Sequence, residues 1–318
     1  MNVPVLRLSM LKKYFPYKKG LFVKAVDGIN LEIFPGETLG LVGESGSGKS
    51  TVAYTVVGMY APTEGKITYK GQDISFPSKF RPHEMKGRIR IVFQDPNSSL
   101  NPRRTIRQIL SIPLKLHKNN SNGEFPSSPE ALLEEVGISP TYVHRFSRSL
   151  SGGERQLVAI AHALATDPDL VLLDEPTSAL DVSIQAKVIN RLVDLQERHR
   201  LSYLFITHDL SLMRNVAHRV AIMYLGKMCE IAKTREFFEN PLHPYTQMLL
   251  SSIPVVTGEE EQLKPKKITS RGEIPSPVNI PPGCSFNLRC PFAMDKCKEV
   301  DPEMKEFEAE HHVRCHLY

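Results

Sequence analysis

The stretch GLVGESGSGKST, residues 40–51, decides the fold class of this chain. The spacing of Gly43, Gly48, Lys49 and Ser50 matches the phosphate-binding pattern G-x-x-x-x-G-K-[ST]. An apolar run precedes the stretch and STVAYTVVGMY can continue it as a helix, so strand, loop and helix come in the required order. Glycines let backbone N–H groups turn inward at a helix N-terminus, where they favour an anion. The stretch therefore predicts a nucleotide phosphate site in an α/β protein.

The polar residues of this loop have separate expected roles. Lys49 would place its positive charge on the β- and γ-phosphates, and the Ser50 hydroxyl would bind Mg²⁺. We expect every residue of the loop to contact the nucleotide, namely Gly43, Glu44, Ser45, Gly46, Ser47, Gly48, Lys49, Ser50 and Thr51.

A second stretch, DLVLLDEPTSALD at residues 169–181, places two carboxylates after an apolar strand. Asp174 ends that strand, at the edge where α/β sheets bind their ligands, and is placed to hold the magnesium shell. Glu175 beside it is the natural general base for an attacking water. Paired carboxylates after a strand are a weak sign alone, but together with the phosphate loop they predict nucleotide hydrolysis.

Composition and charge narrow the class of protein. A chain of 318 residues can form one large domain with an appendage, or two modest domains. The net charge is only +5 and no basic stripe is interleaved with aromatic residues, so we expect no nucleic-acid partner. The N-terminal sequence lacks a signal-peptide pattern and no run of about 18 apolar residues occurs. We therefore expect a cytoplasmic chain without a membrane span.

The pattern of apolar residues changes along the chain. Short apolar runs separated by Gly and Pro predict strands up to about residue 98. A helical pattern follows, in which SSPEALLEEVG has Ser128 as N-cap, Pro129 at the first helical position and Gly137 as the stop. Between 150 and 250, strand-like and helical stretches alternate, which predicts a parallel sheet flanked by helices.

The C-terminal region differs from the rest of the chain. Eight prolines lie between Pro254 and Pro302 inclusive, too many for long helices. This composition predicts a separate, loop-rich appendage that needs a covalent or metal staple.

Four further motifs occur in a fixed order: Gln94 in IVFQDP, SLSGGERQ at 149–156, SALD at 178–181 and His208 in FITHD. With the phosphate loop and LVLLDE, they resemble the motifs of ATP-binding cassette (ABC) proteins. Relatives often read QRVAIARAL after the signature, whereas Leu157 and His162 replace the two arginines here.

The resemblance implies a fold and a domain division. The expected fold is an α/β P-loop NTPase cassette, with a RecA-like parallel-sheet core, an antiparallel β subdomain and a helical subdomain. The nucleotide-binding domain would span 1–250, with its helical subdomain at about 99–155. A C-terminal domain of the oligopeptide-transporter type would span 251–318.

The same resemblance implies residue roles. Glu175, His208 and Gln94 would form the catalytic group, and Mg²⁺ would be held through Ser50, Gln94 and Asp174. Phe15 would stack on the adenine of ATP, with Tyr14 and Tyr17 as alternatives. The signature residues would contact ATP bound to a second cassette, and they are Ser151, Gly152, Gly153 and Glu154. The D-loop would face the same partner, and its residues are Ser178, Ala179, Leu180 and Asp181.

Longer stretches, including FQDPNSSLNPRRTI and ENPLHPYTQMLLSSIP, look like the ATPases of dipeptide and oligopeptide importers. The resemblance implies a motor subunit for peptide uptake at the cytoplasmic face of the cell membrane. Its implied partners are a second ABC ATPase subunit, favoured as a paralogue, two membrane permease subunits and, indirectly, an extracellular solute-binding protein. Nickel complexes or oligosaccharides are alternative cargoes, and a soluble ABC ATPase without a membrane partner is a further alternative.

Four of the five cysteines cluster near the C-terminus with the spacing C-x5-C-x6-C-x17-C, at Cys284, Cys290, Cys297 and Cys315. In a reducing compartment such a cluster indicates a metal centre more often than disulfides. Two metal readings stay open, a [4Fe–4S] cluster, which the family resemblance favours, and a structural zinc ion. Three nearby histidines keep zinc as an alternative, namely His311, His312 and His316. Free structural thiols are a third possibility. Cys229 stands apart in an apolar run and is expected in the core.

Overall fold

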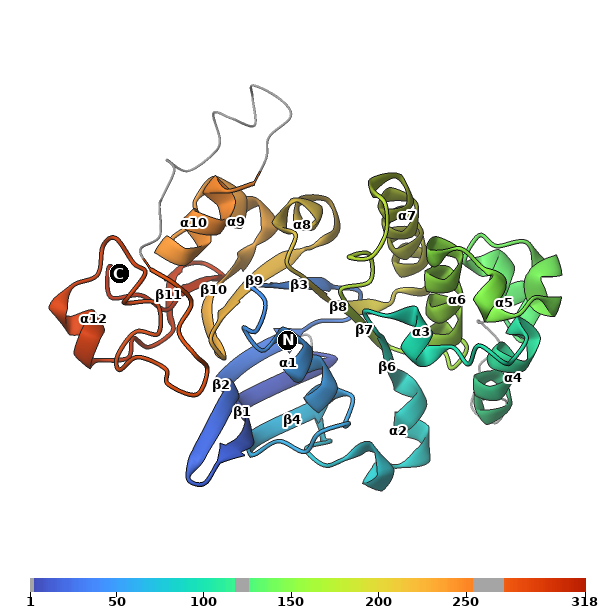
Figure 1. Ribbon diagram of the computed structural model, residues 1–318, viewed down its shortest axis with the longest axis horizontal. Helices are drawn as coiled ribbons and strands as arrows, with labels where there is room; N and C mark the ends of the chain where they lie inside the picture. The colour runs from blue at the N-terminus through green and yellow to red at the C-terminus, as the bar shows by residue number, and fades with distance from the viewer. Residues whose placement is uncertain (1–2, 118–125, 254–271) are drawn as a thin grey trace.

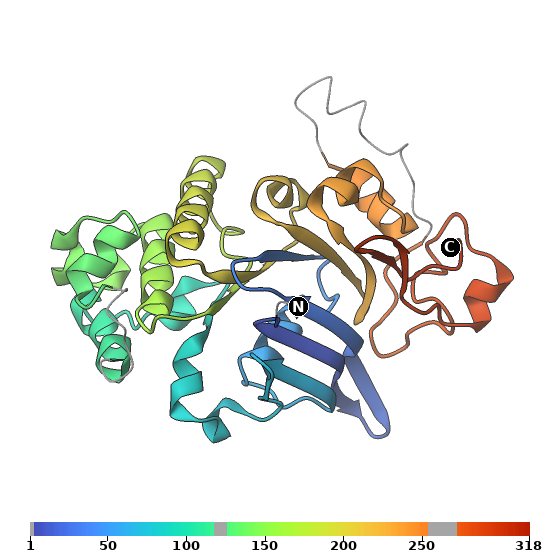
Figure 2. The same cartoon turned by 180° about the vertical axis from the view of Figure 1, so that it is seen from behind.

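The computed structural model describes residues 3–117, 126–253 and 272–318. Within these residues the strands form two sheets, one of eight strands and one of four. The larger sheet forms the centre of the molecule, with a helical lobe at one end and the C-terminal segment at the other (Figures 1 and 2). Among the helices described, none combines the length and the apolar character needed to cross a membrane.

The parallel part of the larger sheet is built from short apolar segments. Its strands run in the order β6 (Ile89–Val92), β7 (Leu170–Asp174), β8 (Ser202–Thr207), β3 (Thr38–Val42) and β9 (Arg219–Tyr224). Every residue of β3, β7 and β8 is buried, as expected for parallel strands covered on both faces. The alternation of strand-like and helical stretches along the sequence predicted this parallel sheet.

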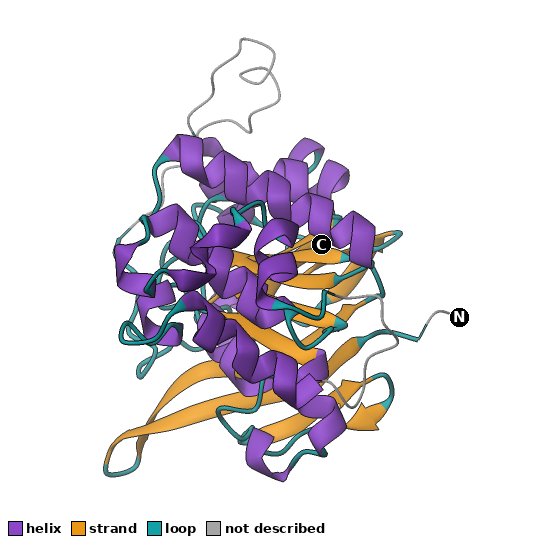
Figure 3. Ribbon diagram, turned by 90° about the vertical axis from the view of Figure 1, so that its right-hand side faces the viewer, coloured by secondary structure: helices purple, strands orange, loops and turns teal. Residues whose placement is uncertain are grey.

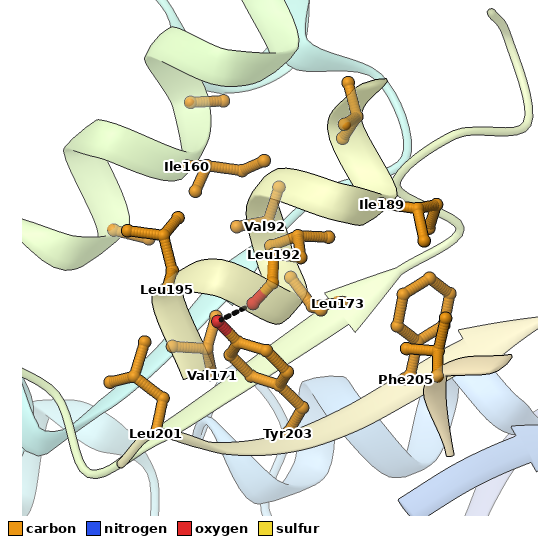
Figure 4. Close-up of a cluster of buried hydrophobic side chains, with 14 of the residues drawn as sticks. Val92, Ile160, Val171, Leu173, Ile189, Leu192, Leu195, Leu201, Tyr203 and Phe205 are labelled. Carbon is orange, nitrogen blue, oxygen red and sulfur yellow. Dashed lines mark hydrogen bonds between the residues drawn. The ribbon is translucent and has the colours of Figure 1, made fainter. Parts of the chain in front are cut away.

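Apolar side chains of the sheet pack against α6 (Gly152–Leu164) and α7 (Val182–His199). Leu173 and Phe205 from the strands meet Ile160, Leu192 and other buried residues (Figure 4). The hydroxyl of Tyr203 donates a hydrogen bond of 3.1 Å to the Leu192 carbonyl, so this buried polar group is satisfied (Figure 4).

Helices cover the sheets (Figure 3). Their bounds are α1 (Lys49–Val56), α2 (His83–Arg88), α3 (Pro96–Ser99), α4 (Ile106–His117), α5 (Pro129–Glu135), α6 (Gly152–Leu164), α7 (Val182–His199), α8 (Leu210–Val216), α9 (Thr234–Glu239), α10 (Pro244–Ser251) and α12 (Asp295–Glu299), with 3₁₀ turns η1 (Ser78–Phe80), η2 (Pro140–His144) and η3 (Ser147–Ser149). The prediction for α5 is confirmed, because the Ser128 hydroxyl accepts from the Ala131 N–H and Pro129 is the first helical residue.

The four-stranded sheet is antiparallel. Its order is β2 (Leu21–Ile33), β1 (Leu6–Lys18), β4 (Glu64–Tyr69) and β5 (Gln72–Asp73). Buried side chains of this sheet share a core cluster with α1 and with one face of the larger sheet. This packing brings β1 and β2 beside the phosphate loop.

The C-terminal segment differs from the separate appendage that the sequence analysis predicted. Strand β12 (His311–Val313) pairs with β10 (Lys227–Lys233), and β11 (Lys305–Glu308) adds a further strand, so the segment extends the larger sheet. Phe286 is 1% exposed and belongs to the main core cluster. The short strand HHV carries no periodic apolar signal, which is why its pairing could not be predicted. Part of the expected 251–318 domain, residues 254–271, lies outside the described residues.

Candidate nucleotide site

The phosphate loop connects β3 to α1, as the sequence predicted. Gly48 caps α1 with a φ of 105°, a backbone conformation that favours glycine. A Cβ at this position would lie 1.9 Å from the Ala25 carbonyl oxygen in β2. Only glycine therefore lets the loop pack so closely against the antiparallel sheet.

Lys49 is buried at the start of α1. Its ammonium donates to the carbonyl oxygens of Gly43 at 2.7 Å and Glu44 at 3.0 Å. Burial lowers the pKa of Lys49, while the carboxylates of Glu175, Asp174 and Glu44 oppose that shift. The lysine is thus held inside the loop that would surround the phosphates.

Asp174 and Ser50 form a polar pair beside the loop. The Ser50 hydroxyl donates to Asp174 Oδ1 at 2.8 Å. Asp174 is 1% exposed, and within the described part of the chain its buried Oδ2 atom accepts no hydrogen bond. Burial raises the pKa of Asp174, although the Ser50 hydrogen bond works in the opposite direction. An orphaned carboxylate oxygen next to a hydroxyl fits the oxygen ligands that Mg²⁺ requires.

Glu175 lies between Gln94 and His208. Gln94 Nε2 donates to Glu175 Oε2 at 3.0 Å, and His208 Nδ1 lies 3.3 Å from Glu175 Oε1. These residues follow β6, β7 and β8, three neighbouring parallel strands, so their carboxyl ends meet at one edge of the sheet. Glu175 has a φ of 47°, which is uncommon for a residue with a side chain and marks a constrained position.

These side chains line one cleft of about 690 Å³. The phosphate loop and the polar group around Glu175 line it, and Phe15, Val23 and Pro277, which lie close together, form its apolar end. The lining residues are Phe15, Val23, Ala25, Ser45, Gly46, Gly48, Lys49, Ser50, Thr51, Gln94, Glu175, His208 and Pro277.

Phe15 lies at the apolar end of the cleft, where it packs edge-on against Tyr60 with 5.2 Å between ring centroids. Of its two rivals for stacking on the base, Tyr14 donates its hydroxyl to Asp27 and Tyr17 is 58% exposed, and neither lines the cleft. Pro277 also lines this end, although the sequence analysis did not select it. No motif surrounds Pro277 that could have identified it.

The signature residues lie away from their own chain's cleft. Ser151 caps α6, accepting from the Glu154 N–H at 3.3 Å while its own N–H donates to the Glu154 carboxylate at 2.7 Å. A Cβ on Gly153 would lie 2.4 Å from the Ile184 side chain on α7, so the helix approaches closely there. Ser178 and Asp181 are exposed in the D-loop that leads into α7, with Ala179 and Leu180 between them.

The four C-terminal cysteines line one small pocket, together with His243, Phe286, His316 and others. Burial raises the pKa of the thiols of Cys284, Cys290 and Cys315 to about 11. In the described ranges, no group of three or more His, Cys, Asp or Glu residues is placed to hold a metal ion. The structure thus brings the predicted thiols to one pocket but does not present the predicted metal centre.

The three histidines considered as zinc ligands do not lie together at this pocket. His311 is buried against Glu230, with 2.7 Å between Nε2 and Oε1, and does not line the pocket. Neither does His312, whereas His316 lines it and donates from Nε2 to the Val300 carbonyl at 2.8 Å. Cys229 is 4% exposed in β10, as expected for a core residue.

Two family models match the chain. The model described as ABC transporter covers residues 26–178, and the model described as oligopeptide/dipeptide transporter, C-terminal region, covers residues 229–297. The solved structure of a dimeric ATP-binding cassette in a post-hydrolysis state, bound to ADP and Pi, has a TM-score of 0.64 and 28% identity. It covers 72% of this chain and 99% of that chain.

Curated relatives match nearly the whole chain. The oligopeptide transport ATP-binding protein AppF of Bacillus subtilis (strain 168) is 50% identical, over 99% of this chain and 97% of that protein. The dipeptide transport ATP-binding protein DppF of Escherichia coli (strain K12) is 42% identical, over 96% of this chain and 92% of that protein. The chain therefore belongs to the family of oligopeptide and dipeptide transport ATP-binding proteins, which are ATPases of the ABC type.

Proposed function

We propose that this ATPase drives the uptake of di- or oligopeptides through partner membrane subunits. The observation that carries ATP hydrolysis in this proposal is the position of Glu175, hydrogen-bonded to Gln94 and close to His208 at the edge of the phosphate-loop cleft. The names of the relatives indicate the cargo, since they describe proteins of oligopeptide and dipeptide transport. Membrane attachment would come from permease subunits, with the chain at the cytoplasmic face.

Each polar group of the cleft has a proposed task in hydrolysis. Glu175 accepts a proton from the water that attacks the γ-phosphate in line, and Gln94 and His208 orient that carboxylate. The ammonium of Lys49 and the backbone N–H groups of the loop bind the β- and γ-phosphates. Asp174, Ser50 and Gln94 would hold Mg²⁺, which would neutralise charge at the phosphates.

A second ATPase subunit completes the proposed site. Ser151, Gly152, Gly153 and Glu154 do not line their own cleft, and the N-terminus of α6 presents the backbone N–H groups that favour an anion. We assign these residues, and the exposed D-loop, to the nucleotide of a partner cassette. The partner is favoured as a paralogue of this chain, so that the two subunits close around two ATP molecules.

We assign the cysteine pocket to a structural [4Fe–4S] cluster, with zinc as the alternative. Its ligands would be Cys284, Cys290, Cys297 and Cys315, whose thiols line the same pocket. Because burial raises the pKa of three of these thiols to about 11, a bound metal would have to displace protons to obtain thiolates. Its role would be to stabilise the C-terminal segment, since the segment lies outside the hydrolytic group.

The Glu175→Gln variant tests the catalytic assignment. It keeps the hydrogen-bonding shape but removes the base, so steady-state ATP turnover should fall by about 100-fold or more while ATP binding persists. Size-exclusion chromatography with ATP should show a closed dimer, formed with the candidate paralogue and not with this chain alone. Asp194→Asn, which alters an exposed carboxylate on α7, is the matched control and should keep native turnover. Native turnover in Glu175→Gln would remove Glu175 from the role of base.

A further inference from the structure

Arg289 joins the C-terminal segment to the phosphate loop. Its two terminal nitrogens donate to the two carboxylate oxygens of Glu44, Nη1 to Oε2 at 2.6 Å and Nη2 to Oε1 at 3.0 Å. The Arg289 side chain is 7% exposed and that of Glu44 is 24% exposed. This fork-to-carboxylate geometry is specific to arginine, and partial burial strengthens it relative to a surface ion pair.

The backbone of Glu44 is held from the same direction. Its N–H donates to the Tyr245 hydroxyl at 2.9 Å, and Tyr245 is fully buried on α10. The Tyr245 ring lies 5.2 Å from Phe286 and 4.7 Å from Tyr224, which places it in an aromatic cluster shared by the C-terminal segment and β9. Both the side chain and the backbone of Glu44 are therefore fixed by residues on the C-terminal side of the chain.

The position of Glu44 decides the shape of the phosphate loop. Its carbonyl oxygen accepts from Lys49 Nζ at 3.0 Å and from the Ser47 N–H at 3.2 Å. A displacement of Glu44 would thus move both the turn of inward-facing N–H groups and the lysine. Anion binding by such a turn depends on the alignment of those groups.

The C-terminal segment also reaches the apolar end of the cleft. The Lys24 N–H in β2 donates to the Pro277 carbonyl at 3.3 Å, and Pro277 lines the apolar end beside Phe15 and Val23. Proline offers a rigid apolar ring with little conformational entropy to lose on binding.

We propose that the C-terminal segment shapes the nucleotide site at two places, the phosphate loop and the base pocket. Arg289 is a positioning residue that sets the phosphate loop through Glu44, and Pro277 forms one wall of the base pocket. The affinity for ATP then depends on a segment that contains none of the family's nucleotide motifs. The proposal does not require a metal at the cysteine pocket.

Binding of ATP and of inorganic triphosphate to the full chain separates the two roles. In Arg289→Gln, the Kd for both ligands should rise roughly tenfold, because the neutral, shorter side chain cannot keep the two charge-assisted hydrogen bonds to Glu44, while turnover at saturating ATP changes less than about twofold. In Pro277→Ala, the Kd for ATP should rise roughly threefold and that for inorganic triphosphate should stay native, since triphosphate has no base. Lys298→Gln, which removes a charge from the same segment at an exposed ion pair, is the control and should bind both ligands normally.

Glu44→Gln keeps the test decisive if Arg289→Gln folds poorly, because it breaks the pair from the loop side. It should raise the Kd for ATP and for triphosphate by a similar factor. The Kd values of the double variant should be close to those of either single variant. Native binding of inorganic triphosphate in Arg289→Gln, or additive effects in the double variant, would overturn the role of Arg289. Equal losses for ATP and triphosphate in Pro277→Ala, or native binding of both ligands, would overturn the role of Pro277.

Discussion

Acid should destabilise this chain through one half-buried histidine, His162 on α6. His162 lines a cavity between α6 and β6 together with Arg90, Val92 and Ala159. Burial, with a smaller contribution from the positive charge of Arg90, lowers the pKa of His162 from its ordinary value of 6.5 to about 4. Arg81 and Lys86 also line this cavity, so among the side chains that the structure describes, the charged ones lining it are positive.

The sign and size of the effect follow from that pKa. The unfolded chain binds a proton at His162 more readily than the folded chain, so the contribution to stability is complete above pH 6.5 and is lost as the pH falls towards 4. Between about pH 7.5 and about pH 5, the two pKa values imply a loss of about 2 kcal/mol from this group alone.

Urea unfolding of the native chain and of His162→Gln at the two pH values measures this loss. Carboxylates and other histidines also titrate in this range, but they do so in both proteins, so the difference between the two pH responses isolates His162. The glutamine variant should lose about 2 kcal/mol less than the native chain on acidification. Arg90→Met provides a second variant, which should reduce the acid sensitivity because it removes the nearby charge. An identical pH response in the native chain and His162→Gln would refute the reasoning.

The phosphate loop could be predicted from the sequence because its determinants are local. The glycine spacing, the preceding strand and the following helix all lie within residues 38–56, and each follows from backbone geometry and the apolar pattern. The edge of the sheet where Asp174 lies could also be inferred, since the carboxyl ends of neighbouring parallel strands meet in space. The separations along the chain between Gln94, Glu175 and His208 are large, and only the family resemblance connected these residues beforehand.

Contacts across the sheet could not be inferred in the same way. Arg289 and Glu44 are 245 positions apart, and neither an arginine beside a cysteine nor a glutamate within a glycine-rich loop indicates its partner. The pairing of the strand His311–Val313 with β10 could not be predicted either, because three residues are too few for a periodic pattern. High proline content predicted few long helices beyond residue 254, and within residues 272–318 the helix described, α12, has five residues. It gave no information on where the loops would pack.

Three further predictions concern the loop, the thiol pocket and the C-terminal strands. Gly48→Ala should abolish ATP binding measured by calorimetry, because its Cβ would lie 1.9 Å from the Ala25 carbonyl; native affinity would contradict this. Cys284→Ser should remove the iron found after anaerobic purification, about four per chain by elemental analysis, whereas Cys229→Ser should keep it. Stoichiometric zinc would indicate the alternative centre, and a metal-free native chain would exclude both. Finally, His311→Ala should lower the free energy of unfolding by about 3 kcal/mol and speed hydrogen exchange in β12, because Glu230 is fully buried and its carboxylate would lose the partner at 2.7 Å. The neighbouring change His312→Ala, at a half-buried position, should do neither. The Leu242 and His243 N–H groups would still donate to Glu230, so a loss below about 1 kcal/mol would mean that these two bonds alone satisfy the carboxylate and that β12 is held by packing.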